Sequence, residues 1–444
     1  MSKIFKKLSS FQLILLGFAT VILTGAFLLM LPVSTSSGEY ASFSDSLFTS
    51  VSAVCVTGLV TQDTATYWSQ FGQIVILLLI QVGGLGVVTA ASAIAFIARR
   101  KINLRQRSTM QEAVSAQQVG GIVKFTGFIF KTTFLIELIG MLLLMPVFCK
   151  DFGFIKGLWY SVFHSISAFC NAGFDLLGVR TQFSSLTTYA SSPLLNITIM
   201  LLIISGGLGF ATWEDIRYHR HHIKKYRMQS KVIIVTTVVL LLIPMVYFYF
   251  FEFLNWEMSL SERLLASAFQ AVTPRTAGFN TVNFTNMYQS SLCVIIILML
   301  IGGSSGSTAG GMKTNTLAVL VSSAVSVFKR RDDINFFGRR IETDILHRAV
   351  AILMLYLSLF LTSGIAISRI DNLPLTDCLF ETASAIGTVG LTTGITPQLC
   401  MASRIILMLL MFFGRVGGLT FIYAAYMHPK KSFSKLPVDK ISVG

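Results

Sequence analysis

Long apolar segments alternate with polar connections along the whole chain, and this alternation predicts the class of fold. A membrane-spanning helix needs about 20 apolar residues to cross a hydrocarbon core of about 30 Å. Eight segments meet this requirement, at about 11–31, 69–98, 124–149, 191–212, 230–254, 290–328, 345–368 and 400–427. We therefore predict an all-α membrane protein with eight transmembrane segments.

Four short motifs between these segments resemble one another. They read FTSVSAVCVTGL (48–59), FHSISAFCNAGF (163–174), FQAVTPRTAGF (269–279) and FETASAIGTVGL (380–391). Each runs from a phenylalanine to a glycine followed by Leu or Phe, and the glycines recur every 105–115 residues. This period indicates four repeats, each made of a span, a re-entrant helix with its loop, and a second span. The expected boundaries are 1–110, 111–225, 226–340 and 341–428, with a tail at 429–444.

Each motif predicts a short helix that enters the membrane and stops near its middle, because about eleven residues cannot cross it. The negative end of the helix dipole then favours a cation at that depth. Glycine permits the backbone conformations that aim successive carbonyl oxygens at an ion, and rings of carbonyls replace the ion's hydration shell. The predicted ion filter is the main chain of Val56, Thr57, Gly58, Asn171, Ala172, Gly173, Thr276, Ala277, Gly278, Thr388, Val389 and Gly390.

The sixth apolar segment is too long for one straight span. A helix over 291–328 would measure about 57 Å against a core of about 30 Å, so we expect a break at the glycine- and serine-rich stretch 302–311. A polar loop at that point, beneath the third filter motif, would gate a pore by lying across it. The predicted gate consists of Gly302, Gly303, Ser304, Ser305, Gly306, Ser307, Thr308, Ala309, Gly310, Gly311, Lys313 and Arg415.

Arg415 lies inside the last apolar segment, where a charged side chain is costly and faces a cavity or a partner group. Its cation would repel cations below the filter. The alternative is a side chain that extends to the cytoplasmic interface, and this alternative applies equally to Lys313. Glycines at 83–86 and 206–209 lie in the second spans of the first two repeats, where we expect close helix packing.

Basic residues are concentrated in alternate connections. Of the 35 Lys and Arg residues, 25 lie near the N-terminus, at 99–124, 217–231 and 329–348, and in the C-terminal tail. By the positive-inside rule these segments are cytoplasmic, so both termini are expected inside the cell. The net charge of +15 is thus an orientation signal, and we expect no nucleic-acid partner.

The four motif endings VTGL, NAGF, TAGF and TVGL, the glycine-rich loop of the third repeat and the arginine of the fourth resemble the Trk/Ktr/HKT superfamily of potassium transporters. The resemblance covers residues 11–427, and it is strongest to KtrB-type membrane subunits of bacterial Ktr systems. In this superfamily a serine at the first filter glycine accompanies sodium transport, so glycine at all four positions implies potassium. Arg275 departs from the pattern, because Cys55 and Cys170 occupy its position in the first two repeats.

The resemblance further implies a plasma-membrane protein with one pseudo-fourfold pore in each subunit. It implies a homodimer and a cytosolic nucleotide-binding regulatory ring of the KtrA type, which binds in trans and controls the gate. Potassium would be the transported ion, and no cofactor is expected in this chain.

Two other functions were weighed against a passive, gated potassium-uptake subunit. A secondary transporter coupled to Na⁺ or H⁺ needs an intramembrane carboxylate, and Glu137 is the candidate deep in a span. A membrane enzyme needs a catalytic or metal-ligating constellation, and the spans contain none in sequence. The stretch at 302–311 also lacks the spacing of a phosphate-binding loop, because Met312 separates Gly311 from Lys313.

Overall fold

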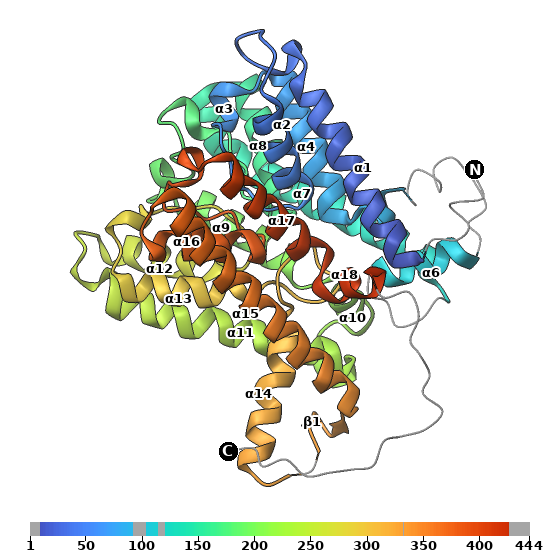
Figure 1. The fold of residues 1–444 in the computed structure, drawn as a ribbon. Coiled ribbons are helices and arrows are strands. Elements are labelled where there is room, and N and C mark those ends of the chain that lie inside the picture. The colour runs from blue at the N-terminus through green and yellow to red at the C-terminus, as the bar shows by residue number, and fades with distance from the viewer. Residues whose placement is uncertain (1–8, 92–103, 114–119, 332, 426–444) are drawn as a thin grey trace.

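The computed structural model describes residues 9–91, 104–113, 120–331 and 333–425, which form a bundle of helices (Figure 1). Several residues of the predicted basic set lie outside the described residues: Lys3, Lys6, Lys7, Arg99, Arg100, Lys101 and the tail at 429–444.

Each repeat contains a long first helix, a short helix and an interrupted second helix. The first helices are α1 (Ser10–Met30), α7 (Ile122–Phe152), α11 (Met228–Tyr247) and α15 (Thr343–Asp371). The short helices are α2 (Phe43–Val54), α8 (Phe154–Phe169), α12 (Leu260–Val272) and α16 (Leu375–Gly387). The interrupted helices are α4 (Gln70–Leu85), α9 (Pro193–Gly207) with α10 (Phe210–His219), α13 (Gln289–Leu300) with α14 (Thr314–Phe328), and α17 (Met401–Val416) with α18 (Gly418–Ala425).

Smaller elements join these helices. They are α3 (Thr64–Tyr67), α6 (Leu104–Ala113), a π-helical turn at Phe248–Glu252 and the antiparallel strand pair β1 (Asn335–Phe336) and β2 (Arg339–Arg340). Helical turns of the 3₁₀ type occur at Pro32–Ser34, Leu177–Val179, Thr187–Tyr189, Ile223–Lys225, Phe253–Asn255, Phe284–Asn286 and Thr396–Gln398.

Four helical stretches of the described chain are long and apolar enough to cross a membrane: α1, α7, Met228–Asn255 and α15. The pair α9 and α10 qualifies as a fifth if its two parts, bent by 97°, count as one span. The predicted all-α membrane fold is confirmed, while the count of eight spans and the repeat boundaries stay predictions.

A break in the second helix occurs in all four repeats, and not only at 302–311 as the sequence predicts. In repeats 1, 2 and 4 the helix stops at Gly86, Gly209 and Gly417, whose φ angles are +84°, +83° and +91°. Glycine adopts such angles without steric cost, whereas a residue with a Cβ does so rarely. The expectation that the glycines of repeats 1 and 2 serve only helix packing is therefore wrong for Gly86 and Gly209.

Close packing does explain three other glycines, which lie three residues before each break. A Cβ on Gly83, Gly206 or Gly414 would collide with a main-chain carbonyl at the end of the short helix of the same repeat. The carbonyls belong to Val54, Phe169 and Ile386, respectively. Glycine thus brings the interrupted helix into backbone contact with the short helix, as predicted for repeats 1 and 2.

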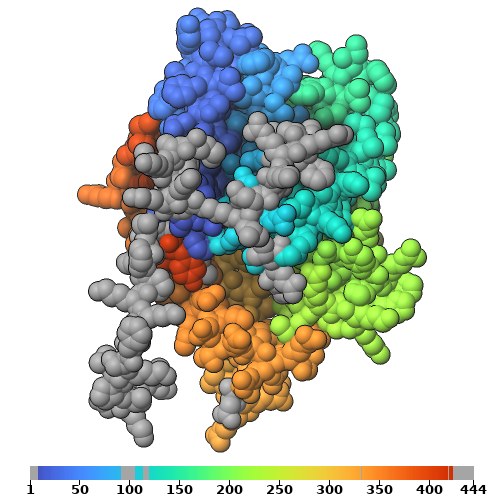
Figure 2. All heavy atoms as spheres, turned by 90° about the vertical axis from the view of Figure 1, so that its right-hand side faces the viewer, coloured from blue at the N-terminus to red at the C-terminus, as the bar shows by residue number. Residues whose placement is uncertain are grey.

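We define the basic face as the side on which α1, α7, α11 and α15 begin. There α14 and β1 project beyond the bundle, at the bottom of Figure 1. The α14–α15 connection, orange in Figure 2, lies beside the α10–α11 connection, and a cavity of about 600 Å³ between them is lined by Lys225, Arg227 and Arg339. The two basic segments at 217–231 and 329–348 therefore meet on one surface.

Replacing Gly206 by Leu is expected to destabilise the fold by about 1–3 kcal/mol, because the new side chain has no room beside Phe169 and Thr308. The measurement is the thermal unfolding midpoint of the purified protein in detergent. The control is Gly127→Leu in α7, where a Cβ meets no atom within 4 Å. Equal midpoints for the two variants would contradict the close packing described above.

Candidate functional site

The four short helices end where the motif glycines begin. Each motif phenylalanine is at most 1% exposed and holds its short helix in the core. Each helix stops a few residues before the glycine of its motif, so four helix C-termini, with their unpaired carbonyls, point toward one region. The phenylalanines are Phe48, Phe163, Phe269 and Phe380.

The four motif glycines form a closed ring in chain order. A Cβ on Gly58 would lie 3.1 Å from the Cα of Gly173, and one on Gly173 would lie 2.9 Å from the Cα of Gly278. A Cβ on Gly278 would lie 3.3 Å from the Cα of Gly390, and one on Gly390 would lie 3.0 Å from the Cα of Gly58. These approaches leave no room for side chains. We call these four residues the glycine ring.

The residue two positions before each ring glycine also has a positive φ, which the sequence did not predict. The angles are +56° for Val56, +59° for Asn171, +66° for Thr276 and +51° for Thr388. Positive φ is a genuine outlier for β-branched residues such as Val and Thr. Such strain persists only where surrounding contacts hold it, and it clusters at functional sites. Its fourfold recurrence therefore makes these segments the candidate functional site.

Hydroxyl side chains on the short helices hold this strained backbone. The Oγ atoms of Ser52 and Ser384 accept hydrogen bonds of 3.0 and 2.9 Å from the main-chain N–H groups of Gly58 and Gly390. In the other two repeats the hydroxyl donates instead to the carbonyl that follows the ring glycine. These bonds run from Ser167 to Phe174, at 2.7 Å, and from Thr273 to Phe279.

These four hydroxyl residues belong to the candidate site and were not predicted from the sequence. Each lies four residues after the motif phenylalanine, so a column-by-column comparison of the four motifs contains the signal. We call Ser52, Ser167, Thr273 and Ser384 the anchor residues.

The side chains of the predicted filter residues are packed away from solvent. All eight that precede the ring glycines are at most 1% exposed. The Asn171 side chain lies 3.2 Å from the Thr276 hydroxyl, so it joins repeats 2 and 3. The amide, when oriented to accept from that hydroxyl, also donates to the carbonyls of Ala168 and Ile203.

Arg275 directly precedes the third filter segment, 276–278, and its side chain extends toward α11. Its guanidinium donates to the Thr237 hydroxyl of α11 at 3.4 Å, and the residue is 6% exposed. The side chain therefore contacts the first helix of its own repeat.

The loop between α13 and α14, residues 301–313, packs against the ends of two short helices. On the side of repeat 2, the N–H and hydroxyl of Ser304 both donate to Gly207, and the Thr308 hydroxyl donates to Phe169 at 3.0 Å. On the side of repeat 4, the Gly311 N–H donates to Gly414 of α17 at 3.2 Å, and a Cβ on Gly311 would lie 2.9 Å from the carbonyl of Gly387 at the end of α16. The loop thus crosses from repeat 2 to repeat 4 next to the glycine ring.

The remaining residues of the predicted gate bond within this loop or to its neighbours. Gly302 N–H donates to Met312, Thr314 N–H to Gly303, Phe210 N–H to Gly306, and Asn315 to the Ser305 hydroxyl. Ser307 donates to the Ser304 carbonyl. Lys313 donates to the carbonyls of Ala309 and Gly310, at 2.7 and 3.2 Å. Lys313 therefore folds back onto the loop instead of extending to an interface.

Arg415 joins the loop to the first repeat. Its guanidinium donates to the carbonyl of Thr308 in the loop and to the carbonyls of Gly83 and Gly84 at the end of α4. The last carbonyls of a helix lack the usual i+4 donor, and the arginine donates to two of them, in addition to the Gly86 N–H that donates to Gly83. A cavity of about 140 Å³ adjoins Arg415 and is also lined by Lys313 and Glu112. Through the loop and Arg415, all four repeats are connected.

Besides Glu137, the candidate from the sequence, the buried carboxylates of the described helices include Glu252 and Glu381. Glu137 is 5% exposed and accepts from Gln81 at 3.4 Å. Glu381 in α16 accepts from the hydroxyls of Thr392 and Thr396. Glu252 accepts from the Tyr288 N–H at 3.3 Å. Each has a protein donor. No group of three or more metal-ligating side chains occurs among the described residues.

Comparison with known proteins decides the family. The family model TrkH, described as cation transport protein, matches residues 9–436. The chain belongs to this family. TrkH-family proteins are membrane transporters rather than enzymes, so the membrane-enzyme alternative is excluded. The expected resemblance to the Trk and Ktr proteins is confirmed.

Several relatives of this TrkH-family chain match it over nearly its whole length. The potassium/sodium uptake protein NtpJ of Enterococcus hirae is 39% identical and covers 99% of this chain and 98% of its own. The Ktr system potassium uptake protein B of Bacillus subtilis is 37% identical, covering 98% and 96%. The crystal structure of the potassium transporter TrkH from Vibrio parahaemolyticus has the same fold, with a TM-score of 0.74 at 17% identity and coverage of 93% and 83%.

Replacing the anchor residue Ser384 by Ala is expected to lower the stability of the TrkH-family fold by about 1–3 kcal/mol, because the buried Gly390 N–H loses its acceptor. The measurement is chemical or thermal unfolding of the purified protein. The control is Ser358→Ala, whose hydroxyl donates to Leu355 on an exposed part of α15. A loss no larger than that of the control would contradict the anchoring role.

Proposed function

We propose that this chain is the ion-translocating subunit of a gated potassium-uptake system. Potassium ions would be coordinated by main-chain carbonyls of the glycine ring and of the two residues before each ring glycine. The proposed filter comprises Val56, Thr57, Gly58, Asn171, Ala172, Gly173, Thr276, Ala277, Gly278, Thr388, Val389 and Gly390.

The observation that carries this proposal is the closed glycine ring beside four helix C-termini. Each C-terminus contributes partial negative charge, which favours a cation at the centre of the ring. Four strained segments with positive φ at both ends, repeated around one ring, are a costly arrangement. Rings of backbone carbonyls that replace the water of a monovalent cation explain the cost.

Potassium is favoured over sodium by two independent arguments. All four positions of the ring are glycine, where the superfamily resemblance associates a serine with sodium. The names of the relatives also refer to potassium, including the Ktr system potassium uptake proteins B of Bacillus subtilis and Vibrio alginolyticus. NtpJ is named a potassium/sodium uptake protein, so sodium permeation through this chain should be measured together with potassium permeation.

The 301–313 loop and Arg415 are proposed as the gate. The loop lies against the ends of α8 and α16, and Arg415 places a cation beside it. A positive charge next to a cation pathway opposes conduction. The loop is held by hydrogen bonds to neighbouring backbones and by the burial of Ile301 and Met312. A movement that breaks the hydrogen bonds to repeats 2 and 4 would open the pathway.

The basic face is proposed to be cytoplasmic, with both termini inside, in the plasma membrane. The relatives named as parts of a Ktr system suggest a soluble regulatory partner, and a KtrA-type nucleotide-binding ring fits this role. The meeting of the two basic segments around the cavity of about 600 Å³ supports that face as its docking surface. A homodimer of this chain is proposed on the superfamily resemblance alone.

A cation transporter coupled to Na⁺ or H⁺ is the second candidate. Its specific support is Glu137, a carboxylate in α7 near the Cys170 cap of α8. Its Gln81 and backbone contacts give it a structural role as well. Coupling predicts that potassium uptake follows an imposed proton or sodium gradient at fixed voltage, and a passive gated pore predicts that it does not.

Replacing Gly58 by Ser is expected to lower the K⁺/Na⁺ uptake ratio about tenfold, a change equivalent to about 1.4 kcal/mol. The added Cβ would collide with the Ala172 carbonyl and distort the ring. The measurement is ⁸⁶Rb⁺ and ²²Na⁺ uptake by purified protein in liposomes. Gly127→Ser in α7 is the control, since its Cβ has open space. An unchanged ratio would refute the filter assignment.

Replacing Arg415 by Gln, or deleting two residues from 302–311, is expected to raise uptake in the absence of a regulatory partner by about tenfold or more. The change removes the cation or the loop contacts that oppose conduction. The measurement is again Rb⁺ uptake in liposomes containing this chain alone. Arg348→Gln, on an exposed part of α15, is the control. Variants as closed as the unmodified protein would contradict the gate.

A further inference from the structure

A pseudo-fourfold ring made from one chain has one junction that the chain does not close. Repeats 1 to 4 follow one another covalently, but repeat 4 meets repeat 1 only through side-chain and backbone contacts. On the face opposite the basic face, the segments that follow the ring glycines also contact one another at the three covalent junctions. This junction is therefore where the ring depends most on specific side chains.

On the face opposite the basic face, the three covalent junctions carry contacts other than ion pairs between repeats. Between repeats 1 and 2 the Phe183 N–H donates to Asp63 at 2.9 Å. Between repeats 2 and 3 the Leu186 N–H donates to Asn280 at 3.0 Å. Between repeats 3 and 4 the rings of Phe284 and Phe380 lie 5.5 Å apart. None of the three is an ion pair between repeats.

The fourth junction carries an ion pair. Arg404 of α17 lies 3.1 Å from the carboxylate of Asp45 in the first turn of α2, and the two side chains are 19% and 13% exposed. Among the five ion pairs of the described residues, this pair joins residues 359 positions apart. Arg227 pairs with Glu214 and Asp215 across the boundary of repeats 2 and 3, on the basic face. The remaining two pairs join residues within one repeat. This ion pair differs from an ordinary surface pair because its side chains are partly buried and because it joins two repeats.

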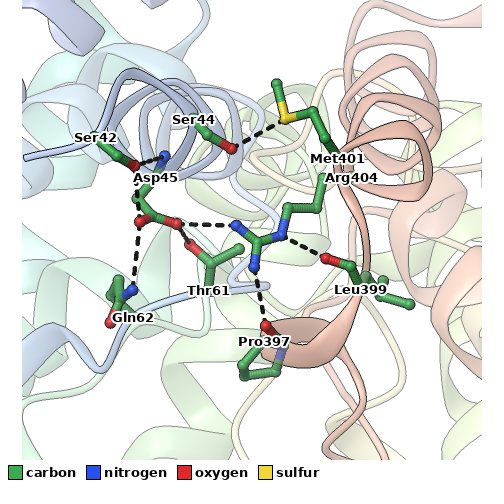
Figure 3. A network of polar contacts seen from close by, with 9 residues as sticks. All are labelled: Ser42, Ser44, Asp45, Thr61, Gln62, Pro397, Leu399, Met401 and Arg404. Carbon is green, nitrogen blue, oxygen red and sulfur yellow. Dashed lines mark hydrogen bonds and ion pairs between the residues drawn. The ribbon is translucent and has the colours of Figure 1, made fainter.

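Each partner of this pair also holds a segment that follows a ring glycine (Figure 3). Asp45 accepts from the Thr61 hydroxyl at 2.9 Å and from the Gln62 amide at 3.3 Å, three and four residues after Gly58. Arg404 donates to the carbonyls of Pro397 and Leu399, both at 2.9 Å, in the corresponding segment of repeat 4. The pair therefore fixes the outer ends of two adjacent segments to each other.

Arg404 and Arg415 lie eleven residues apart on α17, about three helical turns, so they project from nearly the same face. Arg415 bonds to Gly83 and Gly84 of repeat 1, and Arg404 bonds to Asp45 of repeat 1. One helix thus attaches repeat 4 to repeat 1 at both ends. The basic-face attachment belongs to the proposed gate, while the other is independent of it.

We propose that the Asp45–Arg404 ion pair is a positioning pair that closes the glycine ring between repeats 4 and 1 and thereby sets ion selectivity. This inference rests on the proposed function of the ring as a potassium filter. Neither side chain contacts the ring glycines, so both act through the 61–62 and 397–399 segments. Loosening this junction lets the ring widen or narrow, and a ring of variable size discriminates poorly between K⁺ and Na⁺.

The test uses the full chain in liposomes with ⁸⁶Rb⁺ uptake and Na⁺ as competitor. Asp45→Asn and Arg404→Gln are each expected to lower the K⁺/Na⁺ ratio by about five- to tenfold, with a smaller change in the maximal rate. The double exchange Asp45→Arg with Arg404→Asp is expected to recover part of the ratio, because it restores the attraction. Thr61→Val removes only the hydroxyl that Asp45 holds and is expected to give a smaller loss in the same direction.

The matched control is the ion pair of Asp151 and Arg180, 2.8 Å apart, which lies within repeat 2. Asp151→Asn should leave the selectivity ratio unchanged. If Asp45→Asn does not fold, the Thr61→Val variant decides the question. Selectivity that is unchanged in Asp45→Asn or Thr61→Val, but lowered in Gly58→Ser, overturns the positioning role alone. Selectivity unchanged in Gly58→Ser as well overturns the filter on which it rests.

Discussion

Close contact between four main-chain segments is the constraint on which the rest of this structure depends. A ring built from backbone has no side chains to adjust its size, so every other part must hold four peptides in place. The close approach is sterically possible because the ring consists of Gly58, Gly173, Gly278 and Gly390, and no Cβ fits between them. It is also energetically costly, since strained φ angles and helix ends with unpaired carbonyls must be maintained in an apolar surrounding.

The scaffold meets this demand with many small contacts rather than one strong one. The anchor residues hold the backbone at each ring glycine. Glycines three residues before each helix break bring the second helices against the carbonyls of the short helices. The breaks themselves free backbone groups on the other side of the ring, and the 301–313 loop and Arg415 satisfy many of them. The proposed gate and the ring thus share the same hydrogen-bonding groups.

The sequence predicted those parts of the fold that are repeated along the chain or that follow from the length of an apolar segment. The glycine ring followed from the fourfold recurrence of the motif, and the break near Gly302 followed from a segment too long to span. The breaks at Gly86, Gly209 and Gly417 were missed because glycines inside an apolar run suit packing and a kink equally well. The contacts of Asp45 with Arg404 were missed because 359 residues separate them and only the closure of the ring brings them together.

The measurement that tests the account most directly is the position of bound cations in a structure determined with Rb⁺ or Tl⁺, whose anomalous scattering locates the ion. The account predicts density on the axis of the glycine ring, equidistant from the four backbone segments. Density at a carboxylate such as Glu137 or Glu381, with none inside the ring, would contradict it.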